Sequence, residues 1–258
     1  MERKVIILPF DGYSSAAALH KAIASMSLDV WDMTAYIKLN DGVHNSDEGG
    51  PKTVDEIRMN IPGSVGIFLD LKVYDVSATL VNVLKKYHYA PDILTVSSQC
   101  SVNSIIELRK LLPNTKLAMV SMLTDIGEDE CFSRFGFTPE DKIINDLTCI
   151  YEVYLDRRSK DPELPKDPFD LVVCSPKEVA YLKGSLPASY GFIVPGIRDE
   201  WMKKANEHQK RTTGVGEALE SGATFVVMGA QMTKGNPESG VSPETSRALT
   251  LMEIKKVL

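Results

Sequence analysis

Cysteine is scarce in this sequence, and the few cysteines show no metal-binding spacing. The four residues Cys100, Cys131, Cys149 and Cys174 include no C-x-x-C pair, and none of the four histidines stands near them at a ligand spacing. We therefore expect neither a disulfide-stapled scaffold nor a structural zinc site, and no residue is assigned as a metal ligand.

Excess positive charge and long hydrophobic runs are also missing. The chain has 29 Lys and Arg against 35 Asp and Glu, a formal net charge of -6. Nucleic acid is not an expected partner, because duplex binding needs a positive face that displaces counterions. The apolar run at 5–10 is too short for a signal-peptide core, and no other stretch approaches the length of a membrane span. We expect a cytoplasmic protein without membrane contact, in which a few local cations hold any anionic substrate.

Short apolar runs alternate with segments of helical periodicity along the 258 residues, of which 43% are hydrophobic and 25% charged. This composition is typical of a globular protein with a full core. Strands are predicted at residues 5–10, 34–38, 65–70, 93–97, 117–122, 171–174, 192–194 and 224–228. Amphipathic helices are predicted at residues 15–26, 76–87, 104–112, 140–155, 176–182 and 244–257.

This alternation indicates consecutive βα units and a parallel sheet. Eight repeats over this length favour a closed (β/α)8 barrel, a TIM barrel, over an open doubly wound sheet. No Gly/Ser or Pro linker divides the chain, so we predict one domain over 1–258. The polar, Pro-containing segment 157–167 is predicted to be a solvated loop. Working residues are expected at the carboxyl ends of the strands.

One strand end carries an unusual group of charges. In segment 65–79 an apolar run leads directly into Asp70, Lys72 and Asp75. Residues two apart on a strand point the same way, so Asp70 and Lys72 should both face the barrel mouth. Lys38 ends the preceding predicted strand and Asp11 follows the first one, which brings both toward the same mouth. We expect a mutually paired charge network, because unpaired charges are costly to bury.

The bare pattern D-x-K-x-x-D is weak, and taken alone it is better explained as a solvated salt-bridge cluster. Its surroundings change this interpretation, because the sequence resembles the orotidine 5'-monophosphate decarboxylase family over nearly its whole length. The matching segments are FLDLKVYDVSAT at 68–79, LPFD at 8–11, LT at 123–124, VVCS at 172–175, VPGIR at 194–198 and HQKR at 208–211.

The resemblance implies a cofactor-free decarboxylase that converts orotidine 5'-monophosphate to uridine 5'-monophosphate, the last step of de novo pyrimidine synthesis. It implies a catalytic network of Lys38, Asp70, Lys72 and Asp75, with Lys72 protonating C6 of the pyrimidine. It also implies a homodimer with shared active sites, in which Asp75 and Thr79 reach the neighbouring subunit. The remaining expected substrate contacts are Asp11 and Lys38 at the ribose, Thr124 at the pyrimidine edge, Gln209 on a closing loop, and Pro195, Gly196, Gly229 and Ala230 toward the phosphate.

The chain departs from the family pattern at three places. Ala230 stands where an arginine normally grips the phosphate, so backbone N–H groups near Gly196 and Gly229, with Lys234 or Arg198, are left for that task. Ser97-Ser98-Gln99 replaces the usual histidine after the fourth strand, and Gly214 stands where a threonine is frequent.

Two other functions stay open at this point. Related barrels with D-x-K-x-x-D use magnesium to decarboxylate or condense sugar phosphates, but they carry an acid where this chain has Lys38. A catalytically impaired barrel that binds a related nucleotide is the other alternative, suggested by Ala230. The intact set of Lys38, Asp70, Lys72 and Asp75 argues against it, since a pure binder gains little from a costly charge network.

Overall fold

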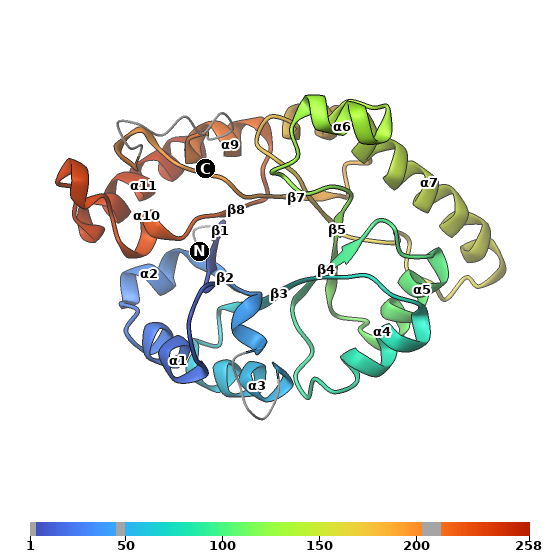
Figure 1. The fold of residues 1–258 in the computed structure, drawn as a ribbon, viewed down its shortest axis with the longest axis horizontal. Coiled ribbons are helices and arrows are strands. Elements are labelled where there is room, and N and C mark those ends of the chain that lie inside the picture. Colours follow the sequence, from blue (N-terminus) through green and yellow to red (C-terminus); the bar gives the residue numbers. More distant parts are fainter. Residues whose placement is uncertain (1–3, 45–49, 203–212) are drawn as a thin grey trace.

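Eight parallel strands close into a barrel in which each strand pairs with its sequence neighbours and β8 pairs with β1 (Figure 1). The computed structural model describes residues 4–44, 50–202 and 213–258. The strands are β1 Ile6–Pro9, β2 Thr34–Leu39, β3 Gly66–Val73, β4 Ile93–Ser97, β5 Lys116–Val120, β6 Leu171–Val173, β7 Gly191–Val194 and β8 Phe225–Val227. The predicted (β/α)8 barrel and all eight predicted strands are confirmed, with ends shifted by a few residues.

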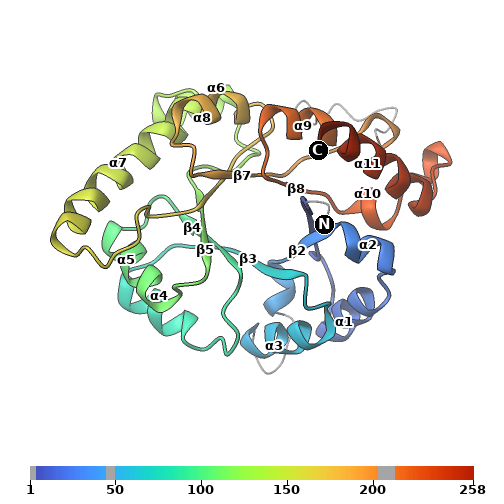
Figure 2. The same ribbon diagram turned by 180° about the vertical axis from the view of Figure 1, so that it is seen from behind.

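Helices surround the outside of the barrel (Figures 1 and 2). They are α1 Ala16–Ala24, α2 Leu28–Met33, α3 Gly50–Asn60, α4 Ser77–Leu84, α5 Val102–Leu111, α6 Glu128–Phe135, α7 Pro139–Lys160, α8 Val179–Ser185, α9 Val215–Ser221, α10 Ala230–Thr233 and α11 Pro243–Val257. Short 3-10 turns lie at η1 Asp41–His44, η2 Glu200–Met202 and η3 Pro237–Ser239. Each predicted helix overlaps an observed one. In the described part of the chain, no helix combines the length and the apolar character that crossing a membrane requires.

The prediction of a loop over 157–167 is wrong for its first residues. Helix α7 continues to Lys160, supported by an ion pair of 2.7 Å between Asp156 and Lys160, one turn apart. Arg157, Arg158 and Lys160 in the last turn are good helix formers even without an apolar face. The helix ends at Asp161 because Pro162 follows and disfavours the helical conformation of the residue before it.

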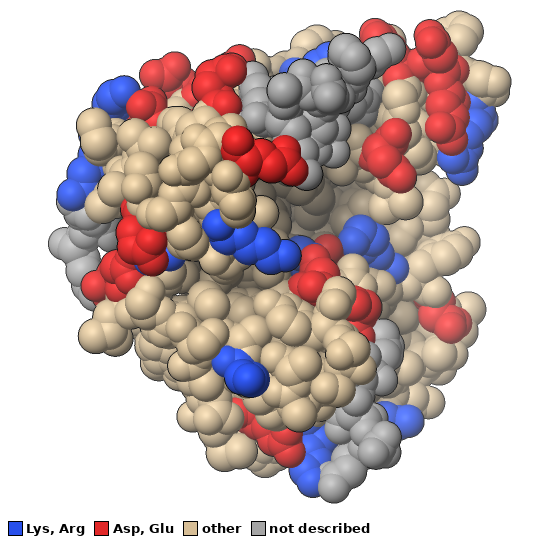
Figure 3. Space-filling view, turned by 60° about the vertical axis from the view of Figure 1, so that its left-hand side comes forward, with Lys and Arg blue, Asp and Glu red and all other residues tan. Residues whose placement is uncertain are grey.

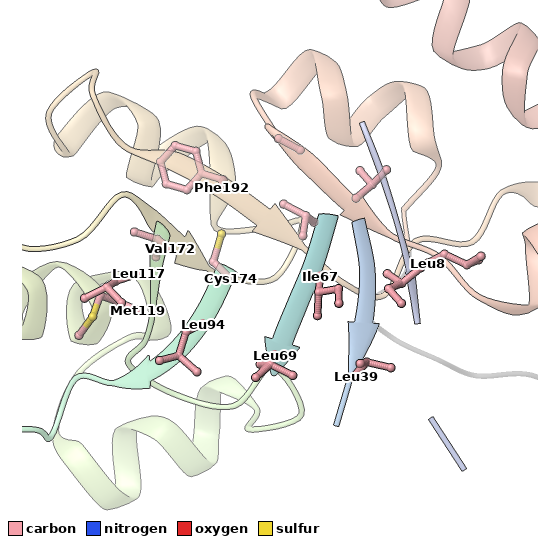
Figure 4. Close-up of a cluster of buried hydrophobic side chains, with 14 of the residues drawn as sticks. Leu8, Leu39, Ile67, Leu69, Leu94, Leu117, Met119, Val172, Cys174 and Phe192 are labelled. Carbon is pink, nitrogen blue, oxygen red and sulfur yellow. The ribbon is translucent and has the colours of Figure 1, made fainter. Parts of the chain in front are cut away.

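Two apolar layers bury the strands on both faces. A small cluster inside the barrel contains Ile7, Phe68, Ile93, Ala118, Leu171, Ile193 and Phe225. A larger cluster lies between the strands and the helices, and Figure 4 shows part of it, including Leu8, Ile67, Leu69 and Cys174. Burial raises the pKa of the Cys174 thiol, so this cysteine is a neutral core residue, as its position in an apolar strand suggests. Phe68 points inward, and Asp70, two residues later, therefore reaches the barrel interior at its carboxyl end.

Polar side chains fix the strand register at the opposite end of the barrel. Strands β4, β6 and β8 are each preceded by a polar residue whose side chain accepts the second N–H of the preceding odd-numbered strand. The pairs are Ile67 N to Asp92 Oδ2 at 2.7 Å, Leu117 N to Asp170 Oδ2 at 2.8 Å, and Phe192 N to Thr224 Oγ1 at 2.9 Å. Both aspartates also bind an arginine of a preceding helix, Arg58 at 2.6 Å and Arg109 at 2.8 Å. This repeated arrangement lies at the amino end of the barrel. Residues at that end contribute to stability, whereas the active sites of such barrels lie at the carboxyl end.

Replacing Asp170 with alanine is therefore expected to destabilise the barrel without touching its mouth. The change leaves the buried Arg109 guanidinium without its carboxylate and the Leu117 N–H without its acceptor. We expect a loss of about 1.5 to 3 kcal/mol in the free energy of unfolding, measured by urea denaturation. Asp156→Ala on the exposed part of α7 is the control and should leave the unfolding midpoint unchanged. Equal midpoints for the two variants would contradict this role of Asp170.

Candidate active site

The carboxyl ends of the first three strands bring four charged side chains into one row. Asp11 lies just after β1, Lys38 on β2, and Asp70 and Lys72 on β3. Lys38 Nζ lies 2.6 Å from Asp11 Oδ2 and 3.5 Å from Asp70 Oδ2, and Lys72 Nζ lies 2.8 Å from Asp70 Oδ1. The charges therefore alternate in sign along the row, so that each aspartate faces at least one lysine.

The centre of this row is largely removed from solvent. The Lys38 and Asp70 side chains are 10% and 13% exposed, whereas Lys72 is 34% exposed and Asp11 42%. Thr95 on β4 donates from its hydroxyl to Asp70 Oδ1 over 3.1 Å and fixes the carboxylate from the other side. Two ammonium groups and a hydroxyl therefore orient this largely buried carboxylate, while the outer lysine remains reachable by a ligand.

Lys72 reaches Asp70 through an irregular backbone and not through simple strand alternation. Its φ of 46° lies in the left-handed region, and it is the only non-glycine residue of the described ranges with a positive φ. The pairing of β3 with β4 shifts register between Leu69 and Val73, and the Lys72 N–H donates to Thr95 Oγ1 over 2.7 Å. Such conformations cost energy and persist where the surroundings hold them, commonly at functional sites.

The row borders a cavity of about 440 Å³ at the barrel mouth. Its floor contains Phe68, Val173, Ile193 and Val227, and its wall contains Asp11, Lys38, Asp70, Lys72, Val120, Met122, Leu123, Thr124, Asp125, Pro9 and Pro195. The apolar floor and the charged wall suit a flat ring that carries an anionic group. Thr124 and Pro195, which the sequence suggested as substrate contacts, both line this cavity.

A second cavity of about 600 Å³ lies on the β7 and β8 side and shares Val227 with the first. It is lined by Gly196, Gly229, Ala230, Arg198 and Lys234, among others. The loops after the last two strands are the usual phosphate-binding region of such barrels. No hydrogen bond or ion pair engages the exposed Lys234 side chain within the described ranges, so its ammonium is available to a ligand.

Asp199 explains how the chain tolerates Gly214. The carboxylate of Asp199 accepts the Val215 N–H over 2.9 Å at the start of α9, and it also binds the amide of Gln231 on α10. A Cβ at Gly214 would lie 2.7 Å from Asp199 Oδ1, too close for any other residue without movement. The helix is thus capped from a distance by Asp199, whose pKa is raised by burial, and not by a threonine at 214.

Asp75 and Thr79 lie outside the row in this single chain. Both side chains are exposed, Asp75 Oδ1 accepts the neighbouring Val76 N–H over 2.7 Å, and within the described residues no ion pair joins Asp75 to Lys72. Gln209 falls in 203–212, outside the described residues. The structure thus brings together Lys38, Asp70 and Lys72 of the expected catalytic set and leaves Asp75 at the surface.

Thr95 is the site residue that sequence reasoning missed. Its only sequence signal is a hydroxyl in the otherwise apolar run 93–96. Within the described ranges, no three His, Cys, Asp or Glu side chains gather as metal ligands. Basic and acidic side chains are interspersed on the face shown in Figure 3, and neither sign forms a continuous patch there.

Known proteins resemble this chain in sequence and in fold. Residues 35–241 match the orotidine 5'-phosphate decarboxylase / HUMPS family. An orotidine 5'-phosphate decarboxylase of Aquifex aeolicus is 31% identical over 208 residues, 80% of this chain and 81% of the relative, and one of Wolbachia pipientis is 29% identical over 195 residues, 74% and 77%.

Solved structures of orotidine 5'-phosphate decarboxylases have the same fold as this chain. The orotidine 5'-phosphate decarboxylase of Lactobacillus acidophilus superposes with a TM-score of 0.69 at 20% identity, covering 98% of this chain and 99% of that one. The Methanocaldococcus jannaschii enzyme complexed with inhibitor BMP gives a TM-score of 0.62 at 17% identity, covering 97% and 99%. Since the sequence match extends over residues 35–241, well beyond half of its length, the chain belongs to the orotidine 5'-phosphate decarboxylase / HUMPS family.

Proposed function

We propose that this protein converts orotidine 5'-monophosphate to uridine 5'-monophosphate and CO2 without a metal or an organic cofactor. The observation that carries the proposal is the alternating row of Asp11, Lys38, Asp70 and Lys72 at the mouth of a barrel of this family. The relatives named above as decarboxylases support the same reaction.

The chemistry needs a cation beside the carbon that loses CO2. Cleavage of the C6–carboxylate bond leaves its electron pair on C6, and a positioned ammonium stabilises that carbanion and then donates a proton to it. Lys72 is the candidate, because its ammonium borders the cavity and is held 2.8 Å from Asp70. Asp70 holds the Lys72 ammonium in place and faces the substrate carboxylate, so repulsion between the two anions is relieved when CO2 departs.

Substrate binding divides between the two cavities. The pyrimidine and ribose fit the first, with Thr124 at the base edge and Asp11 and Lys38 at the ribose hydroxyls. The phosphate fits the second, where backbone groups of Gly196 and Gly229 lie with the side chains of Arg198 and Lys234. Binding energy from the distant phosphate would orient the base over Lys72.

A homodimer with shared sites is part of the proposal. Asp75 just before α4 and Thr79 in its first turn are both exposed, and Tyr74 and Val76 on either side of Asp75 are each 67% exposed. Large apolar side chains that stand exposed beside functional polar residues are typical of a surface that a partner covers. A second subunit packed there would receive Asp75 near its own Lys72.

A magnesium-dependent reaction on a sugar phosphate is the alternative to be tested. It needs an acidic ligand at the position of Lys38, and this lysine is instead paired with both Asp11 and Asp70. We expect purified protein to consume orotidine 5'-monophosphate, followed by its loss of absorbance, at the same rate with and without EDTA. An activity that EDTA removes and magnesium restores would assign the protein to the sugar-phosphate group, and absence of turnover would favour a nucleotide-binding role.

Ala230→Arg is expected to improve turnover of the phosphorylated substrate. Ala230 is the exposed first residue of α10 and lines the second cavity, where an arginine would add a charge-assisted contact to phosphate. Such contacts contribute about 1.5 to 3 kcal/mol, so kcat/KM should rise by about one to two powers of ten. The same variant should change little with orotidine, which lacks the phosphate.

Lys234→Ala and the double variant Ala230→Arg/Lys234→Ala show whether Lys234 binds the phosphate in place of the missing arginine. If Lys234 already binds the phosphate, Lys234→Ala lowers kcat/KM for orotidine 5'-monophosphate and Ala230→Arg compensates for it in the double variant. If neither change has an effect, the phosphate does not bind in the second cavity.

A further inference from the structure

A buried ion pair lies behind the wall of the first cavity, outside the catalytic row. Asp146 and Lys142 stand one turn apart on α7, their side chains are 11% and 9% exposed, and Lys142 Nζ lies 2.5 Å from Asp146 Oδ2. The Lys142 ammonium also lies 4.9 Å from the ring centre of Phe135. Pairs this deeply buried are often no more stabilising than apolar residues of the same size, so stability alone is a weak reason for their presence.

Asp146 gathers donors from two strand ends on the same oxygen. Its Oδ2 accepts from Ser98 Oγ over 2.8 Å and from Gln99 Nε2 over 3.3 Å, both just after β4, and from Ser121 Oγ over 2.7 Å, just after β5. The two strand ends are also joined by the Ser98 N–H, which donates to the Val120 carbonyl over 2.9 Å. One carboxylate of α7 thus ties together the loops that leave two neighbouring strands.

The loop that begins at Ser121 continues directly into the cavity wall. Met122, Leu123, Thr124 and Asp125 all line the first cavity. Between α7 and these residues, Ser121 is the side chain through which Asp146 acts on the loop. A displacement of this loop would move Thr124 relative to the floor at Phe68 and Val173, and a displaced hydrogen-bonding group loses its contact with the bound base.

We propose that Asp146 is a positioning residue that holds the loop 121–125, and with it Thr124, at the distance from the barrel floor that the substrate base requires. The inference rests on the proposed function for the identity of the substrate, although the contacts that carry it do not. Asp146 touches no substrate in this arrangement. Its contribution acts on binding of the base, so it should appear in KM more than in kcat.

The decisive variant removes the ion pair without leaving an unpaired charge. In Lys142→Met/Asp146→Leu, apolar side chains of similar size replace both ions, so no buried charge loses its partner. The hydroxyls of Ser98 and Ser121 lose their acceptor, so we expect the thermal midpoint to fall by several degrees while the barrel stays folded. We expect KM for orotidine 5'-monophosphate to rise about 10- to 100-fold in this folded variant, because the loop is no longer tied to α7. Hydrogen exchange of the peptide that contains residues 121–125 should become faster. A folded double variant with wild-type KM and wild-type exchange would overturn the proposal.

Two further variants keep the test sharp if the double variant fails to fold. Ser121→Ala cuts only the link between Asp146 and the loop and should raise KM about 3- to 10-fold, the effect of one hydrogen bond. Asp156→Asn breaks an exposed ion pair of the same i,i+4 geometry on the same helix and should change neither KM nor exchange. An unchanged KM and unchanged exchange in Ser121→Ala would reject the proposal.

Failure of the proposed function is distinguishable from failure of this inference. If the wild type does not turn over orotidine 5'-monophosphate, the proposed function falls. The exchange of residues 121–125 in the double variant then still decides whether Asp146 holds the loop.

Discussion

Lys72→Ala is expected to abolish decarboxylation while leaving the barrel folded. Loss of a general acid lowers rates about 10²- to 10⁴-fold, and loss of a preorganised charge beside the developing carbanion adds to it, so kcat should fall by at least about 10⁴. The fold should survive because Asp70 keeps its contacts with Lys38 and Thr95. The measurement is the loss of substrate absorbance, with circular dichroism to check the fold.

Two control variants separate the effect of losing the Lys72 ammonium from the effect of the left-handed backbone at this position. Lys72 has a φ of 46°, a conformation that costs a side chain about 1–2 kcal/mol and a glycine almost nothing. The thermal midpoint of Lys72→Gly should therefore be at least as high as that of Lys72→Ala. Both variants should be equally inactive. Lys160→Ala, at an exposed ion pair of α7, should retain full activity. Near-normal turnover in a folded Lys72→Ala protein would refute the mechanism.

The fold was predictable because its determinants are local. Most strands, such as Ile6–Pro9, are short and mainly apolar runs between helical segments, and eight such repeats allow few arrangements other than a barrel. The motif around Asp70 and Lys72 similarly indicated the family, the barrel and the carboxy-lyase class, all of which are confirmed. Sequence order alone placed Lys38 and Asp11 at the same mouth, since neighbouring parallel strands end side by side.

The parts that escaped prediction depend on contacts between distant residues. The left-handed backbone at Lys72 is fixed by Thr95, 23 residues later. The cap of α9 comes from Asp199, 16 residues before Val215, and Asp146 reads in the sequence as an ordinary polar position of a helix. Sequence periodicity does not indicate such pairings, because each partner by itself resembles an ordinary polar residue of a strand, loop or helix.

Strain and buried charge meet at the carboxyl end of β3. Lys72 carries an unfavourable φ, and Asp70 is a nearly buried carboxylate that faces two lysines. Neither feature helps the barrel fold, because apolar residues in a regular strand would be at least as stable there. Both features make sense if the site is built to hold an ammonium beside a substrate carboxylate, at some expense of stability.

Mixing two inactive variants is expected to restore activity if sites are shared between subunits. Lys72→Ala and Asp75→Asn chains should each be inactive as homodimers. In a heterodimer, one site combines the intact Lys72 of one chain with the intact Asp75 of the other. Random re-association makes about half of the dimers mixed, each with one intact site, so the mixture should recover about a quarter of the wild-type activity.

The structure gives a reason to expect this result. Asp75 is exposed and separated from the row in a single chain, although its spacing from Lys72 is part of the motif. Exposed Tyr74 and Val76 beside it offer an apolar surface for a partner. Mixing Lys72→Ala with Asp70→Asn is the matched control and should restore nothing, because both residues belong to the same half of a site. Recovery in the control, or sedimentation of the active enzyme as a monomer, would contradict shared sites.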